Sequence, residues 1–399
     1  MSPNAGLYGA PARDARERDA LVNSATKDLT KGVAGKVAEA SSSFGYKLIK
    51  QLPAEGNVII SPLSISSALA MTLNGAAGDT QRQMLDALGY VKLTPLQVNE
   101  ASRTMRDLLG NVDPTVQLQV ANSIWTRKGV EFKPEFLKTN EDSFGAKTSQ
   151  LDFGSDTAVA TLNSWVKDAT QGKIEKIIER LTDDDRMVLM NAVYFKGTWK
   201  SPFAKEATTE GKFTNAKGAA VTVPMMAQQG SFPYADSKDY QAVSLPYGNG
   251  RIEMTIYLPK GSIDDMVKAS VDWPKDTAPK QNSTVAVKMP KFKAEYEQNL
   301  NKSLQALGMK EAFTDKADFS GMTGDKTLFV SEVMHKTFIE VDEAGTEAAA
   351  ATSVKMTLTT TARDQAVQFT VDKPFLFVIR ESATGLVLFT GVIRDPGAK

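Results

Sequence analysis

Residues 343–362 constrain the fold more than any other part of this 399-residue chain. Local preference makes residues 347–351 helical, because they include four consecutive alanines and alanine is the best helix former. The pattern over residues 346–358 predicts a strand instead, since every second residue is uncharged while Glu347 and Lys355 fall on the other face. The uncharged residues are mostly too small to hold a strand on their own. The sequence therefore predicts a strand displayed as a loop, able to slide between two strands that are already packed.

Strand-like segments precede and follow this stretch, at residues 338–342 and 375–379. By composition alone, an Ala- and Thr-rich linker between two domains is the alternative. The motifs favour a different interpretation. Residues 341–352, VDEAGTEAAAAT, resemble the hinge of the inhibitory serpins, and residues 369–377, FTVDKPFLF, resemble the segment that follows the reactive-centre loop in that family. Further family-like segments extend the resemblance over about residues 38–396.

The resemblance implies one α+β unit with the serpin fold. That fold has a mixed or antiparallel main sheet, two smaller sheets, about eight or nine helices and an exposed reactive-centre loop. We therefore expect a single domain over residues 37–399 with the loop at about 343–365, although a length of 399 residues alone suggests about two or three domains.

Residues 1–36 form an N-terminal extension in this interpretation. Leu21, Ala25, Leu29, Val33 and Val37 recur every four residues, which predicts a weak helical stripe broken by Gly32 and Gly35. The extension is either a partly helical or flexible appendage, or an element that docks against the body. Some prokaryotic serpins carry such extensions, and the resemblance is to a prokaryotic member of the family.

Charge and hydropathy exclude several classes of partner. The 47 basic and 47 acidic residues cancel, so the chain lacks the basic excess that binds nucleic acid or an anionic membrane. No apolar run reaches the ~20 residues of a membrane span. No secretory signal is visible, because no basic region followed by an apolar core opens the sequence. The family resemblance implies an extracellular or cell-envelope protein, and a cytoplasmic location is the alternative.

Groups for catalysis are scarce. The chain has no cysteine and a single histidine, His335, so any catalytic triad or metal site would have to include that residue. Two Ser-x-x-Lys patterns, Ser24 to Lys27 and Ser164 to Lys167, fit penicillin-recognising serine hydrolases, but the Lys-Thr-Gly and Ser-Asp-Asn motifs of those enzymes are missing. We therefore expect no enzyme, cofactor or metal, and keep a serine hydrolase as a remote alternative.

The resemblance implies a suicide-substrate inhibitor of serine endopeptidases, with cysteine proteases as further targets. In that mechanism a protease forms an acyl-enzyme with the loop, and the segment from Thr346 onward inserts into the main sheet. The hinge residues carried over from the family are Glu343, Gly345, Thr346, Ala348, Ala349, Ala350 and Ala351. A non-inhibitory serpin acting as a chaperone or carrier is the alternative, which a proline or bulky charge in the hinge would have favoured.

The family's spacing puts the scissile bond between Thr359 and Thr360, with Leu358 as the alternative recognised residue. Threonine or leucine at this position favours elastase-, chymotrypsin- or subtilisin-like targets over trypsin-like ones. We expect the inhibitor to be a monomer that forms a covalent complex with such a protease.

Two further sets of residues are carried over by position. Lys291 and Glu343 match an ion pair where the loop enters the sheet, called the breach, and Trp199 matches an aromatic residue there, with simple core packing as its alternative role. The second set, called the shutter, matches a polar cluster beneath the strands that must part: Ser61, Ser64, Asn191 and His335. We expect His335 to hydrogen-bond in this cluster and hold the sheet closed.

Overall fold

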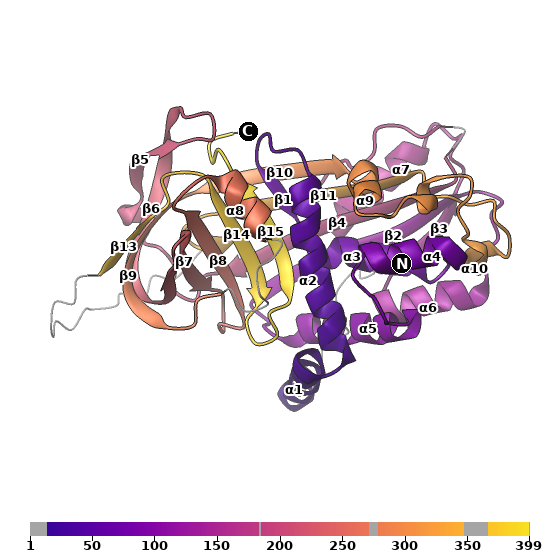
Figure 1. Cartoon of the computed structure of the whole chain (residues 1–399), viewed down its shortest axis with the longest axis horizontal. Coiled ribbons are helices and arrows are strands. Elements are labelled where there is room, and N and C mark those ends of the chain that lie inside the picture. Colours follow the sequence, from indigo (N-terminus) through magenta and orange to yellow (C-terminus); the bar gives the residue numbers. More distant parts are fainter. Residues whose placement is uncertain (1–13, 183–184, 271–277, 347–365, 399) are drawn as a thin grey trace.

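The computed structural model describes residues 14–182, 185–270, 278–346 and 366–398 of the chain. Within these ranges the chain forms ten α-helices and fifteen strands, arranged as two sheets with helices around them (Figure 1). The helices are α1 (Ala15–Lys31), α2 (Val33–Gln51), α3 (Pro62–Leu73), α4 (Gly78–Ala87), α5 (Pro95–Asn111), α6 (Pro134–Phe144), α7 (Ala158–Ala169), α8 (Ile263–Ala269), α9 (Asn301–Ala306) and α10 (Ser320–Thr323). The predicted α+β class is confirmed, and one of these helices, α1, lies in the predicted extension.

The main sheet has six strands in the order β10–β11–β12–β4–β2–β3. Their bounds are β10 (Phe292–Asn299), β11 (Glu332–Val341), β12 (Gly345–Thr346), β4 (Met187–Thr198), β2 (Val116–Arg127) and β3 (Lys147–Leu151). β11 and β4 run parallel and pair directly over residues 332–338 of β11. Beyond that point β12 lies between them, with Thr346 opposite both Val341 and Gly197. The sheet is therefore mixed, and a third strand has begun to separate its two central strands.

The second sheet has the order β1–β15–β14–β8–β7–β6–β9–β13, with β5 paired to β6. Its strands are β1 (Val58–Ile60), β5 (Thr209–Thr214), β6 (Ala220–Asp236), β7 (Tyr240–Pro246), β8 (Ile252–Pro259), β9 (Asn282–Pro290), β13 (Val367–Thr370), β14 (Phe375–Glu381) and β15 (Val387–Ile393). The two smaller sheets that we expected are the two ends of this assembly. The long strand β6 joins them, because residues 234–236 pair with β7 and residues 225–233 pair with β9.

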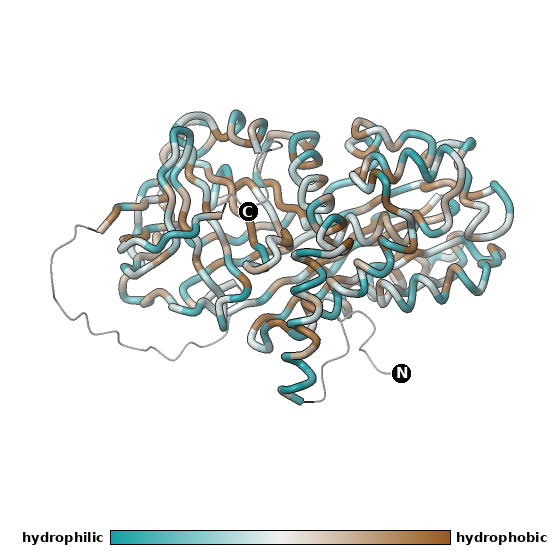
Figure 2. Tube along the Cα trace, turned by 60° about the horizontal axis from the view of Figure 1, so that its bottom comes forward, coloured by the Kyte–Doolittle hydropathy of each residue, from teal (hydrophilic) through white to brown (hydrophobic). Residues whose placement is uncertain are grey.

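The central strand β4 is buried on both faces, which explains its nearly continuous apolar sequence. Met187 and Leu189 belong to the large hydrophobic core that also contains apolar residues of α3 such as Leu69. Val188 and Met190 point the other way and pack in a second core with Val166 of α7. Helices α3 and α7 therefore cover opposite faces of the main sheet. Figure 2 shows hydrophobic segments concentrated in the middle of the molecule and hydrophilic ones along the outer helices and turns.

Helix α3 is wholly buried and presents polar residues to the main sheet. Ser61 caps it by accepting a hydrogen bond from the backbone N of Ser64 at 3.3 Å. Pro62 follows in the first turn, where its missing N–H leaves no hydrogen bond unmade. All twelve residues of the helix are buried. The sequence that starts this helix thus places Ser61 and Ser64 beneath the strands of the sheet.

Helix α1 docks against the body through an apolar face. Val22, Ala25 and Leu29 are buried where α1 packs on α5 and α2. Figure 1 shows α1 at the lower edge of the molecule, next to the end of α2. Of the predicted stripe, Ala25 and Leu29 are buried, but Val22 is buried in place of Leu21 and Val33 is exposed. A helix of ~3.6 residues per turn buries positions three and four apart, so a strict spacing of four drifts off the buried face. Gly32 separates α1 from α2, and α2 runs across residue 36, where we expected the extension to end.

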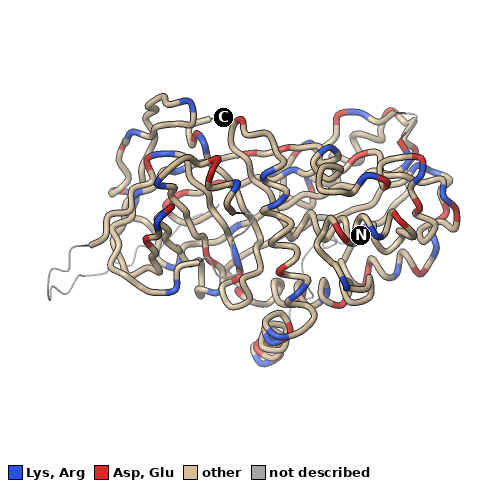
Figure 3. The backbone as a smooth tube through the Cα atoms, viewed as in Figure 1, with Lys and Arg blue, Asp and Glu red and all other residues tan. Residues whose placement is uncertain are grey.

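Charged residues of both signs are interspersed along the described chain, as Figure 3 shows. This distribution matches the zero net charge of the sequence. In the described ranges, no helix combines the length and the hydropathy needed to cross a bilayer.

Candidate functional site

The chain leaves β11, turns at residues 342–346, and starts back into the main sheet; we call these residues the hinge segment. Backbone contacts hold it in place. The N–H of Trp199 donates to the carbonyl of Ala344 at 2.9 Å, and Asp342 Oδ1 accepts from the N–H of Ala344 at 2.8 Å. Thr346, fully buried, closes the segment as part of β12. The predicted start of the reactive-centre loop therefore lies between β11 and β4, in what we call the slot.

Gly345 is required by a close approach to the neighbouring strand. A Cβ at this position would overlap the carbonyl oxygen of Gly197 and lie 2.7 Å from Thr198 Cα. Both obstacles belong to the backbone of β4, so neither can move aside as the end of a flexible side chain would. A side chain at residue 345 would thus push the hinge segment out of the slot.

The carboxylate of Glu343 is fixed on both oxygens. Lys291 Nζ lies 2.8 Å from Oε2, and Thr208 Oγ1 donates to Oε1 at 2.7 Å. Burial raises the pKa of this carboxyl, but the hydrogen bonds from Lys291 and Thr208 outweigh that effect and leave the pKa below its ordinary value. The structure therefore brings together the two predicted breach residues Lys291 and Glu343 as a charged pair, and Thr208 is a partner that the sequence did not indicate.

Trp199 is buried directly against the hinge segment. Its indole Nε1 donates to the carbonyl of Asp342 at 2.9 Å, and its ring stacks on Tyr247 with centroids 4.3 Å apart. The Trp199 side chain therefore packs in the core and also makes a hydrogen bond to the hinge segment.

Tyr247 is a site residue that sequence reasoning missed. Its hydroxyl lies 2.6 Å from Thr346 Oγ1, and both residues are fully buried. Burial raises the pKa of Tyr247 above its ordinary range, so the hydroxyl keeps its proton. The sequence showed this residue only as the end of a short strand, and nothing local in the pattern indicated its contact with residue 346.

A cluster of neutral polar groups crosses the slot farther down. His335 on β11 and Asn191 on β4 are opposite each other in the sheet register, and His335 Nδ1 lies 2.6 Å from Asn191 Oδ1. The backbone N–H of Ser61 donates to His335 Nε2 at 3.3 Å. Asn191 Nδ2 also donates to Ser64 Oγ and, at 2.6 Å, to Asn122 Oδ1. The structure thus brings together all four predicted shutter residues, with Asn122 of β2 as an additional member.

The partners of His335 define its protonation. Nε2 accepts a hydrogen bond, so the proton of the neutral ring is assigned to Nδ1, which donates to Asn191. Burial lowers the pKa of His335 from 6.5 to about 3. A neutral histidine therefore bridges the two strands between which the loop would insert, and parting those strands must break this bond.

Several predicted residues lie outside the described ranges. These are the distal hinge residues Ala348, Ala349, Ala350 and Ala351 and the residues of the predicted scissile bond, Leu358, Thr359 and Thr360. Among the residues that the structure does describe, no group of three or more histidine, aspartate or glutamate side chains could hold a metal ion. Lys167, the lysine of one Ser-x-x-Lys pattern, pairs with Glu175 at 3.2 Å.

Comparisons with known proteins agree with this architecture. The family model for serpins, described as serine protease inhibitors, matches residues 39–396. The leukocyte elastase inhibitor of Homo sapiens is 35% identical over 385 residues, which span 90% of this chain and 100% of that protein. The crystal structure of tengpin, a thermophilic serpin in the native state, has a TM-score of 0.82 at 32% identity, over 90% of this chain and 94% of that one. Human thyroxine-binding globulin has a TM-score of 0.82 at 26% identity, over 92% of this chain and 100% of that one. The chain therefore belongs to the serpin family.

Proposed function

We propose that this serpin is a suicide-substrate inhibitor of serine endopeptidases. The observation that carries the proposal is the state of the slot. Gly345 and Thr346 occupy its first positions as β12, while β11 and β4 still pair directly over residues 332–338. To insert, the residues that follow Thr346 need only extend β12 between β11 and β4.

Cleavage of the loop would free it to move. The serine hydroxyl of the protease adds to the carbonyl carbon of Thr359, the peptide bond to Thr360 breaks, and the protease's own base passes the proton to the departing amine of Thr360. The ester then holds the protease on the new C-terminus. Insertion of the loop carries the protease along before water can hydrolyse that ester.

The exchange of strand contacts favours insertion. The direct pairing of β11 with β4 is lost, but an inserted strand hydrogen-bonds to both neighbours. Ordering the backbone costs ~1–2 kcal/mol per residue, so the new hydrogen bonds and buried side chains must supply more than that. The alternate residues from Thr346 to Leu358 are all uncharged, so the inward face of the new strand buries no unpaired charge.

The alternative is a serpin that acts as a carrier or chaperone. Human thyroxine-binding globulin has the same fold, so the fold alone does not separate the two functions. The hinge segment favours inhibition, because Gly345 and Thr346 fit the slot without a bulky or charged side chain. The similarity to the human leukocyte elastase inhibitor supports elastase-like targets and a role without catalytic turnover.

The test is to mix the protein with elastase, chymotrypsin, subtilisin, trypsin and papain. We expect a complex with at least one of the first three that survives boiling in detergent, and a released C-terminal peptide whose mass begins at Thr360. Cleavage in the loop without a stable complex for all five proteases would overturn the proposal and favour the carrier function.

A further inference from the structure

One turn connects the hinge segment to the N-terminal helix α1. It joins β7 to β8 and comprises residues 247–251, which we call the 247–251 turn. At its first residue, the hydroxyl of Tyr247 bonds to Thr346 Oγ1 at 2.6 Å. At its last residue, Arg251 Nη2 donates to Thr26 Oγ1 of α1 at 3.0 Å. Helix α1 precedes residues 39–396, to which the family model matches, so this contact comes from outside the family match.

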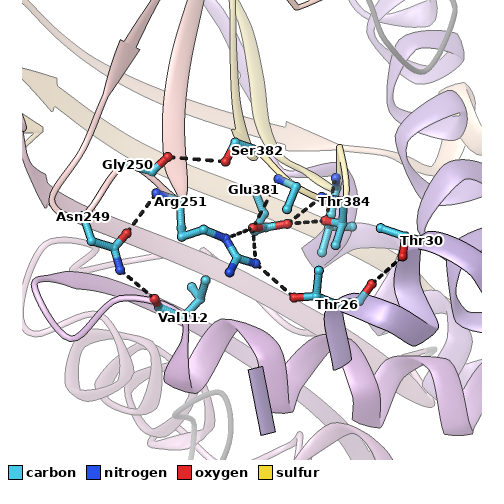
Figure 4. A network of polar contacts seen from close by, with 11 residues as sticks. Thr26, Thr30, Val112, Asn249, Gly250, Arg251, Glu381, Ser382 and Thr384 are labelled. Carbon is cyan, nitrogen blue, oxygen red and sulfur yellow. Dashed lines mark hydrogen bonds and ion pairs between the residues drawn. The ribbon is translucent and has the colours of Figure 1, made fainter. Parts of the chain in front are cut away.

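The guanidinium of Arg251 pairs with the buried carboxylate of Glu381, and Figure 4 shows the two side chains facing each other. Its Nε donates to Glu381 Oε1 at 2.7 Å, and the Glu381 side chain has no exposed surface. The other carboxylate oxygen accepts from the N–H and the hydroxyl of Thr384 at 2.8 and 2.6 Å. A fully buried carboxylate needs its cation, so Arg251 cannot leave Glu381 without a large penalty. Thr26 Oγ1 accepts from Nη2, the nitrogen that also lies 2.7 Å from Glu381 Oε1, and so adds a second contact to the same guanidinium.

The 247–251 turn is held tightly between its ends. Asn249 Oδ1 accepts from the N–H of Arg251 at 2.9 Å, and Asn249 Nδ2 donates to the carbonyl of Val112 at 2.9 Å. The N–H of Asn249 donates to Asp113 Oδ2 at 2.8 Å, and the N–H of Gly250 donates to the carbonyl of Tyr247 at 2.7 Å. Because of these bonds, Tyr247 and Arg251 at the two ends of the turn cannot easily move independently of each other.

The hinge end of the turn is equally constrained. The N–H of Gly248 donates to the carbonyl of Thr198 at the end of β4, at 2.9 Å. The ring of Tyr247 stacks on Trp199, which itself bonds to the hinge segment. A shift of the turn would therefore carry the Tyr247 hydroxyl away from Thr346, the residue from which the loop enters the slot.

We infer that Arg251 is a positioning residue for loop insertion and that α1 strengthens its restraint through Thr26. The pair keeps Tyr247 on Thr346 and so delays insertion until the loop is cleaved. This inference rests on the proposed function, since loop insertion is the step that is delayed. Val22, Ala25 and Leu29 form the buried face of α1 against α5, and this packing holds Thr26 next to Arg251.

The test compares two threonines of α1 that lie one turn apart. Thr26→Val removes the acceptor for Arg251 and keeps the shape of the side chain. Thr30→Val is the matched control, because among the described residues the Thr30 hydroxyl bonds only to the carbonyls of Thr26 and Lys27 within α1, at 2.8 and 3.1 Å. Thr26→Ser restores the hydroxyl. The readouts are the rate of spontaneous loop insertion in the full chain below its unfolding temperature, and the number of inhibitor molecules consumed per protease.

We expect Thr26→Val to speed spontaneous insertion about tenfold, which corresponds to ~1.4 kcal/mol. Thr26→Ser and Thr30→Val should insert at the wild-type rate. In a Tyr247→Phe background, Thr26→Val should have no further effect, because Tyr247 is the residue through which it acts. Equal rates for the two valine variants, or an undiminished effect of Thr26→Val in the Tyr247→Phe background, would overturn the inference.

The same experiment separates this inference from the proposed function. If the wild-type chain never converts to a more stable form after its loop is nicked or after heating, then the proposed function fails. If it converts and Thr26→Val leaves the rate unchanged, only the role of α1 and Arg251 fails.

Discussion

The hinge end of the slot and its middle are held by different chemistry. At the hinge end the main polar contact is the ion pair of Lys291 with Glu343, in which the lysine side chain is 36% exposed. In the middle, His335, Asn191 and Ser61 form neutral hydrogen bonds, and each is at most 2% exposed. The ion pair at the hinge end is charged and its lysine reaches solvent, whereas the cluster in the middle is uncharged and dry.

This difference indicates the order in which the slot opens. An ion pair whose lysine reaches solvent, as Lys291 does, exchanges its contacts for water at a cost of about 1 kcal/mol. Buried neutral groups have no such exchange, and each one left without a partner costs ~1–3 kcal/mol. We infer that the hinge end, where Gly345 and Thr346 already lie as β12, adds a small barrier through the contact of Tyr247 with Thr346, and that the middle sets the larger barrier to insertion of the rest of the loop.

The largest effect should come from a charge placed in the slot itself. Thr346→Arg would bury a guanidinium at a fully buried position, which costs several kcal/mol and slows insertion by about 100-fold or more. The protease then hydrolyses the ester first, so the variant becomes a substrate. The measurement is the ratio of covalent complex to cleaved inhibitor on a denaturing gel.

Thr346→Ser is the control for this substitution, because it keeps a hydroxyl for Tyr247. It should form complex as the wild type does. A Thr346→Arg variant that still gives the wild-type yield of complex would show that a charge at this position does not hinder insertion.

The next effect belongs to the middle of the slot. Asn191→Ala removes the partner of His335, Asn122 and Ser64 together, and should lower the free energy of unfolding by ~3 kcal/mol. It should also speed spontaneous insertion, since the bond across the slot is lost. Urea unfolding and native gels of heated samples measure the two effects.

Asn57→Ala is the control for Asn191→Ala, because it also removes a hydrogen-bonded amide side chain. Asn57 makes three hydrogen bonds, to Arg394 and Asp395, away from the slot. It should lower stability without speeding insertion. If both alanine variants speed insertion equally, the middle of the slot has no special role.

A smaller effect is the pH dependence that His335 confers. The imidazole titrates near 6.5 in the unfolded chain and near 3 in the folded protein, so the unfolded state binds more protons between these values. Stability is therefore complete above about pH 6.5 and falls as the pH drops toward 3. At pH 5 the loss amounts to about 2 kcal/mol, from ~1.4 kcal/mol per pH unit.

His335→Gln should remove this contribution, because glutamine does not titrate. The measurement is the difference in unfolding free energy between wild type and variant from pH 7 to pH 4, which cancels the carboxylates common to both. The role of His335 is falsified if that difference is the same at every pH.

The sequence predicted the contacts that a family pattern records, and it missed those that only the folded chain creates. Lys291, Glu343, Asn191 and His335 were found because they match family positions. Tyr247 was not, since its partner Thr346 lies 99 residues away and no local periodicity joins them. Long-range side-chain contacts of this kind depend on the sheet register, which a single sequence does not reveal.

Helix α1 is a second example of a long-range contact that the sequence did not reveal. Its four-residue spacing predicted a weak helix, and the structure has a helix whose buried face is Val22, Ala25 and Leu29. The pattern could not say what that face packs on. The partner is α5, together with the bond to Arg251, and both depend on how distant elements are arranged.

The smallest change in free energy is expected at the hinge end. Glu343→Lys replaces an attractive pair by two like charges, at ~1 kcal/mol because Lys291 is partly exposed and screened by salt. The hinge segment is then held less firmly, so on heating the loop of one molecule should insert into the slot of another. Size-exclusion chromatography of heated samples would detect the polymer. Glu297→Lys, which breaks the ion pair with Lys336 on β11, makes the same change of charge away from the hinge and should stay monomeric. If Glu343→Lys also stays monomeric, or if both variants polymerise alike, then charge at the hinge end does not control access to the slot.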